Sequence, residues 1–434
     1  MHNTILSLPG PDTFAVSQLE RSTHNPNLSL SRPMHPREAD THCKVMATDL
    51  HKPLQVGRIK LSHRIVLAPC TRYRVDEQHK ILDIVPTYYG ERASVPGTLL
   101  ITEATAVSLW AAGGKRTPVL ETDEQVAAWK RVVDAVHERG SFIFIQLYCQ
   151  GRTAIKEFRD RDGTGPVFSS SAVPLPEMKF GDSIIHRPDE PTPVEMTEED
   201  IQRAIGDWVE AAKKAVNVAG FDGVEIHGAH GFLVDQFIQD VVNQRTDVWG
   251  GSIPNRSRFP LALARAVSDA IGSDRVGIRF SPWNTFRGMG MKERTLPQFT
   301  HLISELKKLD LAYLHLIQPP LAGGPQARRT GSEENLNQPF IDLWKGTTSA
   351  IIVAGGYTAE SARKLVDVDC AGHNMAVAMG RFFTSNPDLV FRIQRGIAPS
   401  MYEREFFYEP AGARGYLGFG VSEEWEKERS KASV

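Results

Sequence analysis

Two histidines at the end of an apolar segment are the first residues that could carry chemistry. His227 and His230 follow the segment Gly223–Ile226, and their spacing would place both rings on one side of a turn. Two N–H donors there could hold a carbonyl or phenolate oxygen and stabilise negative charge on it. The same spacing also suits a zinc ion, with Glu225 or Asp235 as a further ligand. A packing role for one histidine is the third interpretation, and the residues alone leave all three open.

Two further polar residues end apolar segments. Gln146 lies in FIFIQLY and Arg279 in VGIRF. A buried, isolated guanidinium is costly, so Arg279 is expected to meet an anion or an electron-rich ring. An isoalloxazine ring would satisfy it, since an arginine beside the N1–C2 carbonyl edge stabilises the reduced, anionic flavin. A structural ion pair with a neighbouring carboxylate is the alternative.

Glycines next to an arginine predict a phosphate site. Gly355 and Gly356 follow one apolar segment, and Gly380 and Arg381 follow the next. Glycines allow backbone N–H groups to approach a phosphate, and an arginine can add a bidentate contact. The alternative is that the glycines only form tight turns and that Arg381 is solvated.

These residues need elements that bring them to one place, and the chain supplies a regular alternation. Eight short apolar segments alternate with eight amphipathic ones, which predicts a closed (β/α)8 barrel, an α/β TIM barrel. An open, doubly wound sheet is the alternative, but no GxGxxG joins a strand to a helix. Two long excursions, 151–196 and 230–255, follow strand ends. The expected strands are Ile65–Pro69, Leu99–Glu103, Phe142–Leu147, Gly223–His227, Val276–Phe280, Ala312–Leu316, Ile351–Ala354 and Ala376–Gly380. The expected helices are Pro86–Ser94, Asp123–Arg139, Glu198–Val218, Arg256–Ile271, Leu296–Leu309, Gln338–Lys345, Ala359–Val366 and Asn386–Arg395.

Composition excludes several classes of protein. The 434 residues carry a formal net charge of −2, so no basic excess favours nucleic acid or an anionic membrane. Four scattered cysteines form no CxxC pair, and no apolar stretch reaches membrane-spanning length. A cytoplasmic enzyme, monomeric or homodimeric, is expected. Residues 1–46 are polar and predict a disordered extension or a wrongly assigned start, while residues 47–434 form the barrel domain.

Several segments together resemble the old yellow enzyme family, which includes the 12-oxophytodienoate reductases, and in particular its fungal biosynthetic members. The resemblance runs in order from about residue 54 to about residue 418. It implies a (β/α)8 barrel that binds FMN. The segments are VLAPCTRYR (66–74), TLLITEATAVS (98–108), FIQLYCQGR (144–152), GFDGVEIHGAHGFLVDQFIQDVVNQRTDVWGGSIPNRSRF (220–259), VGIRFSP (276–282), AGGYT (354–358) and MGRFFTSNPDLVFRI (379–393).

The resemblance also implies roles for single residues. Thr71 would bind the flavin near O4 and N5, and His227 and His230 would bind the substrate oxygen. Tyr73, Tyr148 and Tyr408 would contact the substrate, a small enone or enal. NADPH or NADH would donate the hydride over the same flavin face. The implied FMN-binding residues are Pro69, Thr71, Ala104, Gln146, Arg279, Gly355, Gly356, Gly380 and Arg381.

One position departs from the family pattern. The family's proton donor is a tyrosine two residues after the second oxygen-binding residue, and here that position is Phe232. Phenylalanine has no hydroxyl and cannot act as that acid. Water, Tyr73 or Tyr148 would then protonate the substrate in a net reduction. Alternatively, the enzyme is a redox-neutral alkene isomerase, because a similar difference separates reductase from isomerase forms among fungal members.

Two functions of other classes remain as alternatives. The first is a metal-dependent hydrolase on the same barrel that uses His227 and His230. The second is a flavin-binding protein without turnover. Bound flavin and bound zinc distinguish the hydrolase from the other two, and reoxidation by an enone separates catalysis from binding alone.

Overall fold

The computed structural model describes residues 48–180, 183–186, 190–319, 335–409 and 412–432. Within them eight parallel strands form a ring, because β11 pairs with β12 on one side and with β6 on the other. This confirms the closed barrel and rules out the open sheet. The expected extension 1–46 lies outside the described residues. The ring consists of β3 (Ile65–Leu67), β4 (Leu99–Ile101), β6 (Phe142–Tyr148), β11 (Gly223–Gly228), β12 (Val276–Phe280), β13 (Tyr313–Ile317), β14 (Ala350–Ala354) and β15 (Met375–Met379).

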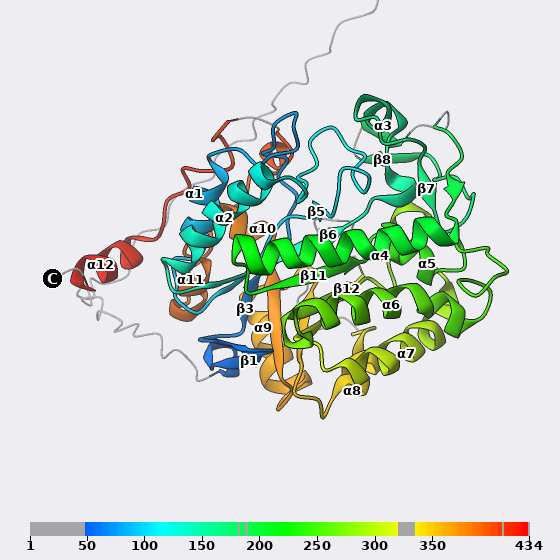
Figure 1. Cartoon of the computed structure of the whole chain (residues 1–434). Coiled ribbons are helices and arrows are strands. Elements are labelled where there is room, and N and C mark those ends of the chain that lie inside the picture. Colours follow the sequence, from blue (N-terminus) through cyan, green and yellow to red (C-terminus); the bar gives the residue numbers. More distant parts are fainter. Residues whose placement is uncertain (1–47, 181–182, 187–189, 320–334, 410–411, 433–434) are drawn as a thin grey trace, which may run out of the picture. The chain divides into compact units, whose positions relative to one another are not determined.

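The eight expected helices also form, with ends shifted by a few residues (Figure 1). Thr197 and Asp200 make a reciprocal capping box at the start of α4, which confirms the expected helix start. The α-helical part of α4 ends at Lys213 rather than near residue 218, because a π-helical turn follows it to Ala219. The helices are α1 (Val85–Arg92), α2 (Asp123–His137), α4 (Glu198–Lys213), α6 (Ile253–Ile271), α7 (Thr295–Leu306), α8 (Gln338–Trp344), α9 (Ala359–Lys364) and α11 (Leu389–Arg395).

The strands are buried on both faces, which explains why they are almost entirely apolar. One set of side chains, including Val66, Phe144 and Ile352, packs inside the ring, and the alternate set packs against the helices. Gly277 in β12 shows how tightly the inside is filled. A Cβ atom there would lie 2.2 Å from the ring of Tyr313 on the neighbouring strand. The barrel interior is therefore a packed core beneath its C-terminal rim.

Smaller elements cover the two ends of the barrel. The hairpin of β1 (Leu54–Val56) and β2 (Ile59–Leu61) contributes its apolar side chains to the inner core. At the other end of the barrel in Figure 1 lie elements of the excursion after β6. That excursion holds α3 (Lys156–Arg161), β7 (Phe168–Ser169), β8 (Met178–Phe180), β9 (Ser183–His186) and β10 (Val194–Glu195), and the excursion after β11 holds α5 (Leu233–Ile238).

The short strand β5 (Thr105–Ala106) pairs with the end of β6, and α10 (Arg381–Ser385) and α12 (Glu423–Ala432) complete the described α-helices and β-strands. The sequence did not predict these three, because each lacks a long period of apolar residues. Among the described helices, none is long and apolar enough to cross a membrane.

Candidate functional site

His227 lies at the end of β11 and carries a defined tautomer. Its side chain is buried, and its Nδ1 accepts a hydrogen bond from the backbone N–H of Ala229 at 3.2 Å. Burial, reinforced by the positive charge of Arg279, holds the pKa of His227 well below 6.5, so the ring is neutral at pH 7. A neutral ring with Nδ1 as acceptor keeps its proton on Nε2. His227 is therefore a hydrogen-bond donor, fixed in place by the turn that follows it.

His230 and Phe232 lie next to this donor. His230 has a left-handed backbone (φ 58°), and its N–H donates to Ser281 Oγ at 2.9 Å. The two imidazole rings are 5.8 Å apart between centroids, and the Phe232 ring is 4.9 Å from that of His227. Burial and Arg279 also hold the pKa of His230 well below its ordinary value. The structure thus brings two neutral imidazoles and the phenyl ring together.

The two carboxylates that a zinc site would need face elsewhere. Asp235 accepts hydrogen bonds from the Gly231 backbone N–H at 2.9 Å and from Gln239 at 2.8 Å. The Glu225 carboxylate binds residues inside the barrel. Within the part of the chain that the structure describes, no three His, Cys, Asp or Glu side chains are grouped to hold a metal ion. The HxxH spacing was compatible with a metal site as well as an oxyanion site. In the structure, neither carboxylate joins the two histidines to form the metal site.

Arg279 at the rim of β12 has no partner among the residues that the structure describes. It is only 7% exposed, and its Nε is buried without a hydrogen bond. Its guanidinium forms no hydrogen bond or ion pair with another described residue, so the structural ion pair considered above is wrong. A buried cation without partners marks a place for an anion or an electron-rich ring. The N–H donors of the Arg279 guanidinium therefore fit the N1–C2 carbonyl edge of the predicted flavin.

Gln146 belongs to a network that the sequence reasoning missed. Its Nε2 donates to Glu225 Oε1 at 2.6 Å, and Glu225 Oε2 accepts from His315 Nδ1 at 2.7 Å. All three side chains are at most 1% exposed. The sequence suggests Glu225 only as a metal ligand and assigns no role to His315. The sequence feature that could have indicated this network is a polar residue within an otherwise apolar strand, such as His315 in YLHLI.

The glycines of the predicted phosphate site follow two neighbouring strands. Gly355 and Gly356 have φ values of 131° and 79°, which only glycine adopts readily. A Cβ at Gly355 would lie 2.7 Å from Gln318 Cβ, and one at Gly380 would lie 2.8 Å from Cys70 Sγ. β14 pairs with β15, so the two loops lie side by side. Their backbone is partly exposed although the preceding strand residues are buried.

Other predicted FMN residues complete the same rim. Pro69 and Thr71 follow β3, which pairs with β15 on one side and with β4 on the other. Ala104 follows β4 and is buried. Arg381 directs its Nη1 to the hydroxyl of Tyr402 at 3.3 Å. The rim therefore presents small residues, glycine turns and guanidinium groups along one arc of the barrel, which suits a phosphorylated flat ring.

The predicted aromatic residues form two groups. Tyr148 packs edge to face on Phe232 at 4.9 Å, and its hydroxyl accepts from Gln150 Nε2 at 3.3 Å. Burial raises the pKa of Tyr148 far above 10, so this hydroxyl is a poor acid. Tyr73 and Tyr408 form a separate, exposed pair with ring centroids 5.7 Å apart. The structure therefore places Tyr148 with the histidines and the other two tyrosines nearer to solvent.

Buried arginines hold the segment that carries Tyr408. Arg72 donates to the backbone oxygens of Phe407 at 3.2 Å and Gly415 at 2.6 Å. Arg74 contacts the oxygens of Phe407 and Arg414 at 3.3 Å. These contacts join the loop after β3 to a segment more than 330 residues later. The pairing of Tyr73 with Tyr408 is thus a consequence of this link.

Arg287 is a second site residue that the sequence reasoning missed. Its Cζ lies 4.2 Å from the centroid of the Phe232 ring, and its Nη1 donates to the His230 backbone oxygen at 3.0 Å. Burial lowers the pKa of Arg287 to about 10, so it remains charged at pH 7. The titratable groups that act on it are Tyr73, Tyr148 and Tyr408, and none of them is a carboxylate. No local pattern indicated this residue, because it lies in an irregular loop.

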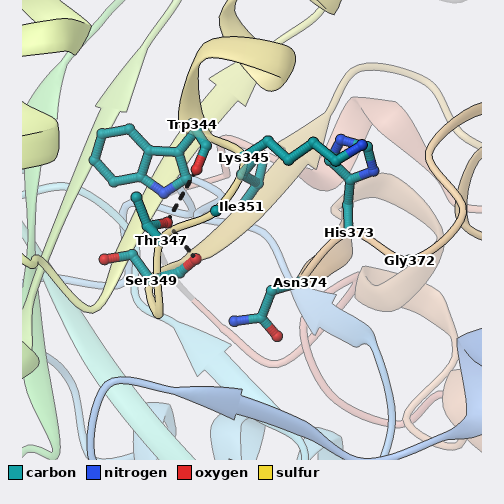
Figure 2. Close-up of a pocket in the computed structure, with 9 residues that line it drawn as sticks. Trp344, Lys345, Thr347, Ser349, Ile351, Gly372, His373 and Asn374 are labelled. Atoms are coloured by element: carbon teal, nitrogen blue, oxygen red, sulfur yellow. Dashed lines mark hydrogen bonds between the residues drawn. The ribbon is translucent and has the colours of Figure 1, made fainter.

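A cavity of about 310 Å³ lies at the opposite end of the barrel. Figure 2 shows the residues that line it. Its lining includes Trp344, Ser349 and His373, which precede β14 and β15. Thr347 Oγ1 lies within hydrogen-bonding distance of the backbone oxygens of Trp344 at 3.0 Å and Ser349 at 3.3 Å, and its one proton can be shared between them. Residues at the N-terminal end of barrel strands usually serve stability. The candidate site therefore remains at the C-terminal rim.

Comparison with known proteins is consistent with this geometry. Residues 49–399 match the model of the NADH:flavin oxidoreductase / NADH oxidase family. A chanoclavine-I aldehyde reductase of Penicillium roqueforti is 47% identical over 88% of this chain and 98% of its own length. A protein of Epichloe festucae var. lolii, named as a probable inactive reductase, is 46% identical over 89% and 99%. The crystal structure of an old yellow enzyme from Pichia superposes with a TM-score of 0.77 at 35% identity, covering 87% of this chain and 94% of that one.

Proposed function

The chain belongs to the NADH:flavin oxidoreductase / NADH oxidase family, that of the old yellow enzymes, and from this premise we propose that it reduces the C=C bond of a small α,β-unsaturated aldehyde. FMN is its cofactor, and NADPH or NADH is its hydride donor. The aldehyde is proposed because a relative of 47% identity is named for the reduction of one. The observation that carries the proposal is the unpaired Arg279 guanidinium beside two neutral imidazoles.

Bound FMN supplies hydride transfer between the nicotinamide and the activated alkene. Arg279 and Gln146 would hold the pyrimidine edge of the ring, and Thr71 would hold the edge near O4 and N5. Gly355, Gly356, Gly380 and Arg381 would hold the phosphate. The support is that these groups, on strands far apart in the sequence, share one rim and that no other described residue pairs with Arg279.

The two imidazoles would bind the carbonyl oxygen of the substrate. His227 presents Nε2–H, because its Nδ1 already accepts from Ala229. A neutral donor polarises the carbonyl and stabilises the enolate oxygen that forms when the β-carbon accepts hydride. The Arg287 charge, which is stacked on Phe232 and forms no ion pair with a carboxylate in the described parts of the chain, would add to this stabilisation. The enolate would therefore persist without an adjacent acid.

The proton for the α-carbon would come from the solvent side of the site. Phe232 has no hydroxyl, and the Tyr148 hydroxyl is held by Gln150 with a strongly raised pKa. Tyr73 is exposed and lies next to Tyr408, so it or an adjacent water is the proposed donor. Net reduction can then still occur, although Tyr73 or water would protonate the α-carbon more slowly than the family's usual tyrosine does.

Isomerisation is the second candidate, and the observation that favours it is Phe232. If the enolate is not protonated, returning the hydride after rotation about the former double bond changes alkene geometry without net reduction. A protein without turnover is the third, since one relative of 46% identity is named as a probable inactive reductase. The same assay separates all three.

The experiment is anaerobic turnover by the purified full-length holoprotein. NADPH should bleach the flavin absorbance, and an enal should restore it while one saturated aldehyde forms per NADPH consumed. In D2O the product should carry deuterium at the α-carbon. An alkene of changed geometry with no net NADPH consumption would support the isomerase instead. Flavin that is reduced but never reoxidised by enals or enones would refute both.

A further inference from the structure

Glu225 is a buried carboxylate that the proposed chemistry does not use. It lies in the middle of β11, is fully buried and faces Gln146 across the strand pairing between β11 and β6. Both of its oxygens are occupied, one by Gln146 Nε2 at 2.6 Å and the other by His315 Nδ1 at 2.7 Å. A buried carboxylate with two short N–H contacts is held in one geometry.

This carboxylate is ionised. Burial alone would raise its pKa, but His315, Arg279 and Gln146 outweigh that effect and hold the pKa of Glu225 below its ordinary value. Glu225 is therefore a negative charge inside the barrel, below the rim where Arg279 supplies a positive one. The two groups form no direct ion pair, so the guanidinium remains available at the rim.

We propose that Glu225 is a positioning residue that orients the Gln146 amide toward the flavin and, through its charge, lowers the midpoint potential of the bound flavin. This inference rests on the proposed FMN site. An ionised carboxylate only accepts hydrogen bonds, so it fixes the Gln146 amide with Nε2 turned inward and Oε1 left over. Among the described residues, nothing donates to Oε1.

The remaining groups then complement the pyrimidine edge of an isoalloxazine ring. That edge carries the N3–H donor between two carbonyl acceptors, with N1 as a further acceptor. Oε1 of Gln146 would accept from N3–H, while the guanidinium of Arg279 only donates and would serve O2 and N1. With the amide reversed, its N–H would face N3–H, and one buried donor would lose its acceptor, which is costly.

The charge of Glu225 also acts on the flavin directly. The ring gains negative charge near N1 on reduction, which Arg279 favours and a carboxylate beneath it disfavours. The midpoint potential of the flavin would therefore depend on two opposing effects, the positive charge of Arg279 on β12 and the negative charge of Glu225 on the neighbouring strand β11. Removing the carboxylate charge should make the flavin easier to reduce.

The test compares variants of the full-length holoprotein by dye-equilibrated reduction and by FMN titration. Glu225→Gln should shift the equilibrium toward reduced flavin about tenfold, or about 30 mV for a two-electron couple. Glu225→Asp keeps the charge but withdraws it from Gln146. The equilibrium constant for flavin reduction should therefore stay within about threefold of the wild-type value, while FMN binds about tenfold more weakly. Ile352→Val, in the same barrel interior and paired in register with His315, is the control for a change of packing alone.

Each outcome decides a separate question. An unchanged potential in Glu225→Gln, with FMN bound and reduced by NADPH, would overturn the inference and leave the proposed function intact. Equal shifts in all three variants would also overturn it, since packing would then be the cause. If Glu225→Gln does not fold, FMN binding as tight in Glu225→Asp as in Ile352→Val overturns the positioning role. Wild-type protein that binds FMN but never turns over would instead refute the proposed function.

Discussion

At the scale of single residues, the hydrogen bonding of His227 fixes what its side chain can offer to a ligand. Because the Ala229 N–H occupies Nδ1, the ring presents a donor and not a base. Its lowered pKa means that this donor does not change its charge near neutral pH. An imidazole that only donates can stabilise an enolate but cannot protonate it at carbon. His227 is therefore not expected to replace the acid that Phe232 lacks.

The first prediction concerns that acid. Phe232→Tyr places a hydroxyl in the ring cluster with His227 and Tyr148, where general acid catalysis contributes about 10² to 10⁴ in rate. We expect faster formation of the saturated aldehyde, with its α-proton from solvent, measured by product analysis in H2O and D2O. Phe232→Leu controls for the changed ring contacts. Equal rates and the same saturated product from wild type and Phe232→Tyr would show that another proton source operates.

At the scale of elements, the loop from β11 into α5 sets the positions of both histidines and Phe232. Asp235 in the first turn of α5 accepts from the Gly231 N–H and holds the chain between His230 and Phe232. Complete burial raises the pKa of Asp235 from 3.8 to about 7. The loop therefore contains an acid whose protonation differs between the folded and unfolded states.

The second prediction follows from this difference. Between about pH 4 and pH 7 the folded state keeps a proton on Asp235 that the unfolded state has lost, so the wild type loses about 1.4 kcal/mol of stability per pH unit there and no more above pH 7. Asp235→Asn cannot ionise. Its unfolding free energy minus that of wild type should rise from pH 5 to pH 7 and then level off, as measured by urea unfolding.

The control for this series is Asp83→Asn, which removes one aspartate charge from an exposed position. A difference between wild type and Asp235→Asn that stays constant from pH 5 to pH 8 would mean that Asp235 ionises equally in both states. In that case the carboxylate would be compensated in the folded loop by a group other than the two hydrogen-bond donors described.

At the scale of the whole molecule, the rim joins residues from almost every part of the barrel. Arg279 comes from β12, Gly355 from the end of β14, and Gly380 from the end of β15, which is itself paired with β3. A ligand that contacts all of them links strands that are distant in sequence. The formal net charge of −2 adds no general attraction for an anionic ligand, so binding would depend on this local arrangement.

The third prediction is therefore a stability effect of the cofactor. Removing FMN should lower the Tm, and adding it back at about one hundred times its Kd should restore about 2.7 kcal/mol. Riboflavin, which lacks the phosphate, should stabilise less if the glycine loops and Arg381 hold that group. Thermal unfolding with each ligand measures this. Equal stabilisation by FMN and riboflavin would contradict the phosphate site.

Local sequence patterns were sufficient to predict the barrel and most of its rim. Continuous apolar strands and their alternation with helices are local patterns, and the C-terminal ends of parallel strands must share one edge. The rim position of Gly355, Gly380 and Arg279 followed from that rule. The motifs that resemble the family then predicted FMN, which the family match bears out. The individual site roles remain predictions.

The contacts between polar side chains could be read from the three-dimensional fold alone. Glu225 and Gln146 are 79 residues apart, and Glu225 and His315 are 90 apart, so no local pattern links them. Arg287 reaches Phe232 from an irregular loop, and the arginines after β3 reach a segment more than 330 residues later. The sequence also did not show that the Glu225 and Asp235 carboxylates, which a zinc site would need, bind Gln146 and Gly231 instead. Side-chain partners depend on strand register and packing around the closed ring, which a local sequence pattern does not contain.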